Sequence, residues 1–232
     1  MMRTAPESLF AAAKTPSQSV TSDPSKARLT QTLTRAFADD PMMTFIFPED
    51  NVREEVLPWF LGSVISYCQR YGEVESSPDA DAVACWLTPG NTRVTPFRQM
   101  RGEGILTPLK LGFERFGRLM ALQNYMTKHH HAHAPEPHYY LYLLGVDPAS
   151  WGRGLGRTLM GKMLARADSE GTPCYLETQN EKNVKVYEKV GFEVMSSGKV
   201  DGHDLNVWTM KRTPATARGQ LTGPFHQISK GA

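Results

Sequence analysis

Residues 139–158 constrain the fold of this 232-residue chain more than any other segment. They begin with an apolar and aromatic run, residues 139–146, which ends at Asp147-Pro148. Three glycines follow at alternate positions and lead into a helical pattern. This order predicts a strand, a glycine-rich turn and a helix. Glycine lets the backbone approach a ligand, and the free N–H groups of a helix start attract anions, so the junction is a candidate phosphate site.

The glycine-rich turn does not fit two common nucleotide-binding motifs. A Walker A loop needs Gly-Lys followed by Ser or Thr, and no such pair stands at the required spacing. A dinucleotide fingerprint would need glycine at the position of Arg157. What remains is an Arg-Gly-x-Gly run at 153–156, shortly after a Val-Asp-Pro sequence at 146–148.

Two motifs together resemble the signature of the GNAT superfamily of N-acetyltransferases. The first is this turn, whose usual form is Val-x-Pro followed by Gln/Arg-x-x-Gly-x-Gly/Ala at a helix start. The second is an Asn-rich turn followed by Tyr and then Gly-Phe. In this chain it is formed by Asn180, Asn183, Tyr187 and Gly191-Phe192.

The resemblance covers residues 25–212, and residues 138–212 look most like the puromycin N-acetyltransferase branch. The resemblance to the superfamily implies a mixed α/β (α+β) fold, in which helices flank a splayed central sheet. The order of strands and helices in the second half, which ends in a hairpin around Gly202, agrees with this fold class. Residues 1–24 are expected to be a disordered leader and residues 213–232 a flexible tail.

In the first half, apolar periodicity predicts a helix from Ser25 to a stop at Asp39-Asp40-Pro41, and further helices over 53–71 and 97–128. Strands are predicted over 73–76 and 82–87.

The predicted helices should each bury one apolar face. The helix over 53–71 should bury Val56, Phe60, Val64 and Cys68, and the helix over 97–128 should bury Leu109, Phe113, Phe116 and Met120. The histidines at 129, 130, 131 and 133 are expected in a solvated loop without a metal. Phe45, Phe47, Trp59 and Tyr67 are expected mainly in the core, although they could wall an acceptor pocket.

The composition limits the kinds of binding partner and the cellular location expected for this chain. The net charge of +2 gives no sign of a nucleic-acid partner, and no apolar run reaches the ~20 residues that span a bilayer. Cys68, Cys85 and Cys174 are expected to be buried free thiols, which fits a reducing, cytoplasmic location. A monomer or a homodimer is expected.

The resemblance implies acetyl-CoA as cosubstrate and suggests where it binds. The end of the strand would meet the pantetheine arm, and the amides of the turn would hold the pyrophosphate. Trp151 stands where Gln or Arg is usual, so a side-chain role there is in doubt. The two asparagines either cap a helix or contact CoA. The candidate donor-binding residues are Leu144, Val146, Trp151, Gly152, Arg153, Gly154, Leu155, Gly156, Arg157, Asn180 and Asn183.

Acetyl transfer to an amine needs a proton acceptor and a proton donor. Tyr187 suits the donor, because a phenol stays protonated at neutral pH and the family has such a Tyr beside the CoA sulfur. Glu177, an acid within an apolar strand, is the candidate base. His138 is the second candidate for the base, since an ordinary imidazole titrates near neutrality.

The predicted function is acetyl-CoA-dependent N-acetylation of a primary amine on a small molecule, such as an antibiotic or aminonucleoside, by direct transfer in a ternary complex. Three alternatives stay open: a longer acyl group, a peptide or protein amine as acceptor, and a non-catalytic CoA-binding sensor or interaction module.

Overall fold

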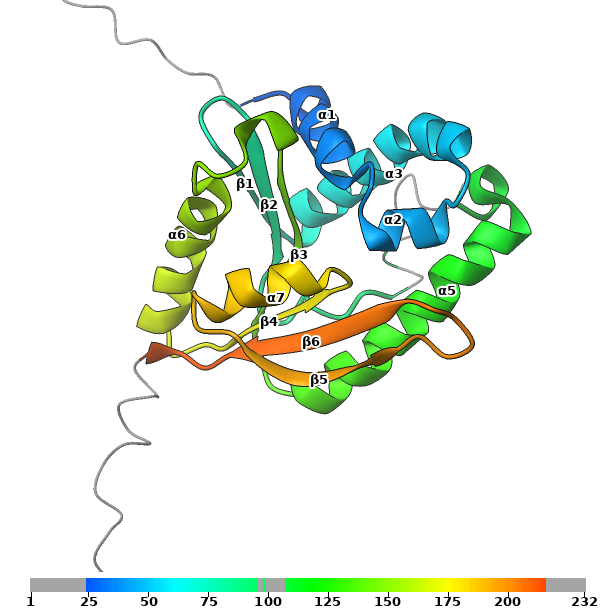
Figure 1. The fold of residues 1–232 in the computed structure, drawn as a ribbon. Helices are drawn as coiled ribbons and strands as arrows, with labels where there is room; N and C mark the ends of the chain where they lie inside the picture. The colour runs from blue at the N-terminus through cyan, green and yellow to red at the C-terminus, as the bar shows by residue number, and fades with distance from the viewer. Residues whose placement is uncertain (1–23, 96–97, 99–106, 216–232) are drawn as a thin grey trace, which may run out of the picture.

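The computed structural model describes residues 24–95, 98 and 107–215. Within them, six strands form one sheet in the order β1-β2-β3-β4-β6-β5, and helices flank it (Figure 1). The strands are β1 (Gly72–Ser76), β2 (Ala82–Leu87), β3 (Tyr139–Val146), β4 (Cys174–Thr178), β5 (Glu193–Lys199) and β6 (Asn206–Arg212). The helices are α1 (Lys26–Phe37), α2 (Pro41–Ile46), α3 (Asp50–Tyr71), α5 (Thr107–His133), α6 (Leu155–Ser169) and α7 (Glu181–Glu188). The predicted mixed α/β fold is confirmed.

Each face of the sheet carries its own apolar core. Successive strand residues point to opposite faces. Tyr140 and Tyr175 therefore pack into the core that α1 and α3 cover, whereas Leu141 and Leu176 pack into the core that α6 and α7 cover. A side chain on β3 or β4 thus reaches one of two separate environments, depending on its position.

The parallel strands β3 and β4 pair only where they begin. The paired residues are Tyr139 with Cys174, Tyr140 with Tyr175, and Leu141 with Leu176. Beyond them, β3 continues beside β2 and β4 continues beside β6. The two strands therefore separate in the middle of the sheet, which agrees with the splayed sheet that the resemblance implies.

A β-bulge in β3 lies at the point of separation. On β2, Trp86 pairs with Leu141 and Cys85 with Leu143, so Tyr142 has no opposite residue. The extra residue lets Tyr142 and Leu143 pack on the same face of the sheet, where alternation alone would separate them.

Capping side chains set the limits of the first two helices. Ser25 accepts a hydrogen bond from an amide in the first turn of α1. Asp40 accepts one from the amide of Met42 at 2.9 Å and so begins α2. The stop predicted at residues 39–41 is confirmed, and the same residues start the next helix.

Two predictions about α5 are wrong. The four histidines lie in the helix, not in a loop, because Pro135 falls beyond its end, and His130 is buried. Gly112 has a φ of 71° and kinks the helix, which breaks the predicted face. As a result Leu109 is 82% exposed and Phe113 97% exposed. Residues 97 and 99–106, which the sequence places in the first part of this helix, lie outside the described part of the chain.

The buried face of α3 differs slightly from the predicted stripe. Leu57, Leu61 and Ile65 are fully buried together with Cys68, whereas Val56 is only partly buried. All three cysteines are free and buried, as predicted. In the described residues, no helix has both the length and the apolar character needed to cross a membrane.

The chain continues against α6 after the last strand. Arg212 donates two hydrogen bonds to Asp168, at 2.8 and 2.7 Å, and the amide of Ala215 donates to the same carboxylate. The predicted leader up to residue 23 and the tail from residue 216 lie outside the described residues, so the predictions for them stay predictions.

Candidate active site

The glycine-rich turn links the end of β3 to the start of α6. Asp147 accepts a hydrogen bond from the amide of Ala149 at 3.0 Å and begins a short 3₁₀ turn, η2 (Pro148–Ser150). Gly152 and Gly154 then have φ values of 79° and 74°, in the left-handed region that favours glycine. Gly154 caps α6 without any side-chain hydrogen bond to the first-turn amides. Those amides are the anion-binding groups of a helix N-terminus.

Space around the turn suits a ligand. A Cβ atom built at Gly152 or Gly154 would meet nothing within 4 Å. At Gly156 it would lie 3.5 Å from Val146 and 3.6 Å from Leu144. The start of α6 therefore rests on the end of β3, while the glycines before it face open space.

The side chains of the turn have different surroundings. Arg153 donates to Ser150 at 3.1 Å and pairs with Asp81 at 3.4 Å. Arg157 is exposed, and no ion pair joins it to the described residues. Trp151 is 67% exposed, but its indole N–H donates to the Val146 carbonyl at 2.9 Å. This contact gives Trp151 a structural role that the sequence does not suggest.

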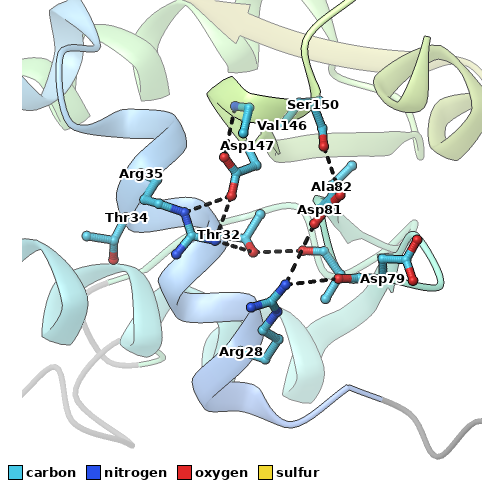
Figure 2. A network of polar contacts seen from close by, with 12 residues as sticks. Arg28, Thr32, Thr34, Arg35, Asp79, Asp81, Ala82, Val146, Asp147 and Ser150 are labelled. Carbon is cyan, nitrogen blue, oxygen red and sulfur yellow. Dashed lines mark hydrogen bonds and ion pairs between the residues drawn. The ribbon is translucent and has the colours of Figure 1, made fainter. Parts of the chain in front are cut away.

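A polar network fixes the turn to α1 (Figure 2). Arg35 donates from Nε to Asp147 at 2.7 Å, and its Nη2 lies 2.6 Å from the same carboxylate. The Ser150 hydroxyl donates to Asp81 at 2.8 Å. Burial alone would raise the pKa of Asp147, but the hydrogen bonds from Arg35 and from the Ala149 amide lower it. A charged Asp147 therefore holds both the cap and the ion pair.

Glu177 lies on β4 where the strands separate. The hydroxyl of Tyr140 donates to its Oε2. Tyr175, two residues earlier on β4, also lowers the pKa of Glu177, although its hydroxyl makes no hydrogen bond of regular geometry with the described residues. Burial outweighs both effects and raises the pKa of Glu177 from 4.5 to about 7. A carboxyl with that pKa can accept a proton near neutral pH.

Tyr187 lies on the other face of the sheet. It is buried on α7, in the same core as Leu176, and its ring meets Phe192 edge-on. Burial first, and then the negative charge of Asp40, raise the pKa of Tyr187. The phenol is therefore protonated at neutral pH, as a general acid must be. Tyr187 and Glu177 therefore lie on opposite faces of the sheet, Tyr187 in the core that holds Leu141 and Leu176 and Glu177 directly after the last residue of β4 that pairs with β3.

His138 is buried at the start of β3. Its Nδ1 lies 2.6 Å from the Glu136 carbonyl, so Nδ1 carries the proton, and its Nε2 lies 2.7 Å from Nε2 of His130. Burial lowers the pKa of His138, and it lowers the pKa of His130 to about 3. Since the free lone pair of His138 already accepts the His130 N–H, the geometry favours Glu177 as the base.

The two asparagines differ in their contacts. Asn180 caps α7, accepting a hydrogen bond from the amide of Lys182 at 3.1 Å. Asn183 is half-buried one turn later, and its amide donates to the Asn180 carbonyl at 3.0 Å. The Asn180 side chain thus serves the helix, and only that of Asn183 is left for a ligand. Among the described residues, no three His, Cys, Asp or Glu side chains form a metal-binding group.

The model of the acetyltransferase (GNAT) family matches residues 74–192, which is half of the chain and includes the turn, β4 and Tyr187. The chain belongs to the GNAT family of acetyltransferases. The puromycin N-acetyltransferase branch, which the sequence suggests, stays a prediction.

Relatives with similar sequences differ in how much of their length is matched. An uncharacterized N-acetyltransferase of Schizosaccharomyces pombe is 27% identical over 196 residues, covering 80% of this chain and 78% of the relative. An uncharacterized protein of Mycobacterium leprae is 41% identical over 61 residues, covering 26% of this chain and only 17% of the relative. The second match is therefore local.

Solved structures share the fold at low sequence identity. A Corynebacterium glutamicum structure named "histone acetyltransferase HPA2 and related acetyltransferase" has a TM-score of 0.56 and 21% identity. The match covers 82% of this chain and 91% of the other. A polyamine N-acetyltransferase of Drosophila melanogaster has a TM-score of 0.53 and 16% identity, covering 79% and 94%. These likenesses support the fold alone.

Sequence reasoning missed three residues of the site. Tyr140 bonds the candidate base, Tyr142 occupies the bulge beside it, and Arg35 anchors the turn from α1. The sequence does mark the two tyrosines. In each of these otherwise apolar strands an aromatic residue is followed two positions later by an aromatic or polar one: Tyr140 by Tyr142, and Tyr175 by Glu177. Arg35 has no such signal, since nothing local links it to a residue more than a hundred positions away.

Proposed function

We propose that this protein transfers the acetyl group of acetyl-CoA directly to the primary amine of a small molecule, within a ternary complex. One observation carries the proposal. A glycine-rich turn with free helix amides lies at one end of β3, a proton acceptor lies on β4 where that strand leaves β3, and a proton donor is buried on the other face in the core of Leu141 and Leu176. A binding module without chemistry would need the turn but not the two titratable groups.

The residues of the turn fit the donor. First-turn amides of α6, the open glycines and the free Arg157 suit a pyrophosphate. Leu144 and Val146 lie at the end of β3 and offer backbone groups to the pantetheine arm; on Val146 this is the amide N–H, because its carbonyl already accepts the indole N–H of Trp151. Asn183 offers a side-chain amide. When bound, acetyl-CoA supplies the thioester.

The protein's own groups then move the protons. Glu177 takes one proton from the acceptor's ammonium, which frees the nitrogen lone pair to form the N–C bond. As the C–S bond breaks, Tyr187 gives its proton to the sulfur and recovers one from the new amide nitrogen. Overall, the amine becomes acetylated, the CoA thiol is formed, and one proton is released to solvent through Glu177.

The names of solved neighbours support a small amine as acceptor, because they include an agmatine and a polyamine N-acetyltransferase. An aminonucleoside such as puromycin is the acceptor that the sequence resemblance favours. The three free buried thiols support a reducing compartment such as the cytoplasm.

Thiol release tests the function. Purified protein should release free CoA thiol from acetyl-CoA when a suitable amine is supplied from a panel that includes puromycin and polyamines. Tyr187→Phe should lower kcat by about 100-fold or more, since it removes the proton donor, and leave the Kd for CoA within about 2-fold. Acetyl-CoA binding without turnover across the panel would instead support a sensor.

A further inference from the structure

Four tyrosines surround Glu177 on the face of the sheet that α1 and α3 cover. We call Tyr67, Tyr140, Tyr142, Tyr175 and Glu177 the tyrosine cluster. Its rings form a continuous row: 6.1 Å separates the centroids of Tyr67 and Tyr142, 5.4 Å those of Tyr142 and Tyr140, and 5.7 Å those of Tyr140 and Tyr175. The row crosses from α3 over β3 to β4, next to the point where the strands separate.

Polar atoms in this cluster lack partners. The Oε1 atom of Glu177 and the hydroxyls of Tyr175 and Tyr67 are closed to solvent and make no hydrogen bond of regular geometry with the described residues. The Tyr175 hydroxyl is near enough to Glu177, and Arg98 near enough to the Tyr67 hydroxyl, to lower the pKa of each, but neither contact has the geometry of a formed hydrogen bond. A buried polar group without a partner costs about 1–3 kcal/mol, so several in one place point to a ligand that completes them. Tyr67, Tyr142 and Glu177 are themselves only half-buried, as residues that line a binding site are.

The missing partner should be a cation. Asp147 and Glu170 each pair with an arginine, but the groups that act on Glu177 are two tyrosine hydroxyls and no lysine or arginine. A carboxylate and the faces of tyrosine rings both attract positive charge. Tyr142 lies between the carboxylate and Tyr67, within electrostatic reach of both.

We propose that the tyrosine cluster binds the acceptor as a primary alkylammonium ion. The ammonium N–H groups donate to Glu177 Oε1 and to the Tyr175 hydroxyl oxygen, and the positive charge and adjoining carbon rest against the ring of Tyr142. The Tyr67 hydroxyl meets a polar group further along the acceptor. This inference rests on the proposed function and narrows its substrate class to amines that are protonated near pH 7. Aromatic amines, which are uncharged there, are excluded.

Binding without turnover tests the proposal. Calorimetric titrations of the full chain at pH 8, without an acetyl donor, compare cyclohexylmethylammonium with cyclohexylmethanol, which has the same shape but no charge. The ammonium should bind at least about 10-fold more tightly, the range of a charged hydrogen bond. Glu177→Gln should abolish this preference. Equal binding of the two compounds to the wild type would overturn the proposal.

A matched pair of variants tests the ring. Tyr142→Leu should weaken ammonium binding by about 2- to 30-fold, the range of a cation–π contact, whereas Tyr142→Phe should stay within about 2-fold. Equal loss in both variants would overturn the role of the ring, and a thermal melt checks that each is folded. Thiol release is measured separately. Turnover of uncharged aromatic amines at rates equal to alkylamines would refute the proposal and leave the acetyltransferase function standing.

Discussion

At the scale of single residues, Tyr140 controls the candidate base. Its hydroxyl donates to Glu177 Oε2. Burial raises the pKa of Glu177 and this bond lowers it, with a net value of about 7. The acidic limb of kcat/KM should therefore fall near pH 7, because activity is lost as Glu177 becomes protonated.

Tyr140→Phe should move that limb to higher pH by about one unit. The substitution removes a hydrogen bond to the charged form only, so the pKa of Glu177 rises further. Tyr139→Phe is the matched control, since its neighbouring hydroxyl bonds Glu170 at 2.7 Å on the opposite face. Steady-state rates with one acceptor across pH measure both variants. An unmoved limb in Tyr140→Phe, or an equal shift in the control, would contradict the assignment.

The sequence alone points to some of the candidate catalytic residues and not to others. Glu177 and Tyr187 can be selected because an acid in an apolar strand and a Tyr before Gly-Phe are local signals. The same reasoning cannot separate Glu177 from His138. What separates them is a contact between α5 and the residue just before β3, in which the His130 N–H occupies the lone pair of His138.

At the scale of elements, the ion pair between α1 and the glycine-rich turn has a clear mechanical role. Arg35 and Asp147 join segments that are distant in the sequence, and Asp147 also caps η2 (Figure 2). Asp147→Asn keeps an oxygen for the cap but removes the charge. The turn should then hold its amides less firmly in place for an anion.

Asp147→Asn should lower the Tm at pH 7 by about 2–4 °C, as expected for a partly exposed pair worth about 1 kcal/mol. The Kd for CoA should rise several-fold. Arg35→Gln should have the same effects, and the double variant should be little worse than either, because both changes break one interaction. Additive losses in the double variant, by differential scanning calorimetry and CoA titration, would show that the pair does not act as a unit.

Elements in the second half follow the sequence closely, and those in the first half less so. β3 and β4 have their predicted limits, because Pro137 and Pro148 flank β3, and Gly171 and Pro173 precede β4. The face of α5 is mispredicted, since the sequence cannot tell that Gly112 adopts a left-handed conformation rather than continuing the helix. The separation of β3 and β4 depends on pairing between strands, so only the family resemblance anticipates it.

At the scale of the whole molecule, groups whose pKa is shifted by burial titrate with opposite effects on stability between pH 7 and 5. The pKa of His130 is lowered to about 3 from 6.5, so the unfolded chain binds a proton that the folded protein does not, and stability falls as pH falls below 6.5. The pKa of Glu177 is raised to about 7 from 4.5, so the folded protein binds a proton first, and stability rises as pH falls below 7. Burial lowers the pKa of His138 as well, so His138 acts in the same direction as His130, and Glu177 offsets part of their joint effect.

Removing the contribution of Glu177 should expose that of the two histidines. Glu177→Gln cannot gain the proton that stabilises the wild type at pH 5, so its Tm should drop between pH 7 and 5 by on the order of 5 °C more than that of the wild type. Glu188→Gln, the same substitution at an exposed position of α7, should follow the wild type. Thermal melts at half-unit steps of pH measure the difference. Parallel curves for Glu177→Gln and the wild type would mean that Glu177 does not hold its proton in the folded protein, and would remove the physical basis for its role as a base that works near neutral pH.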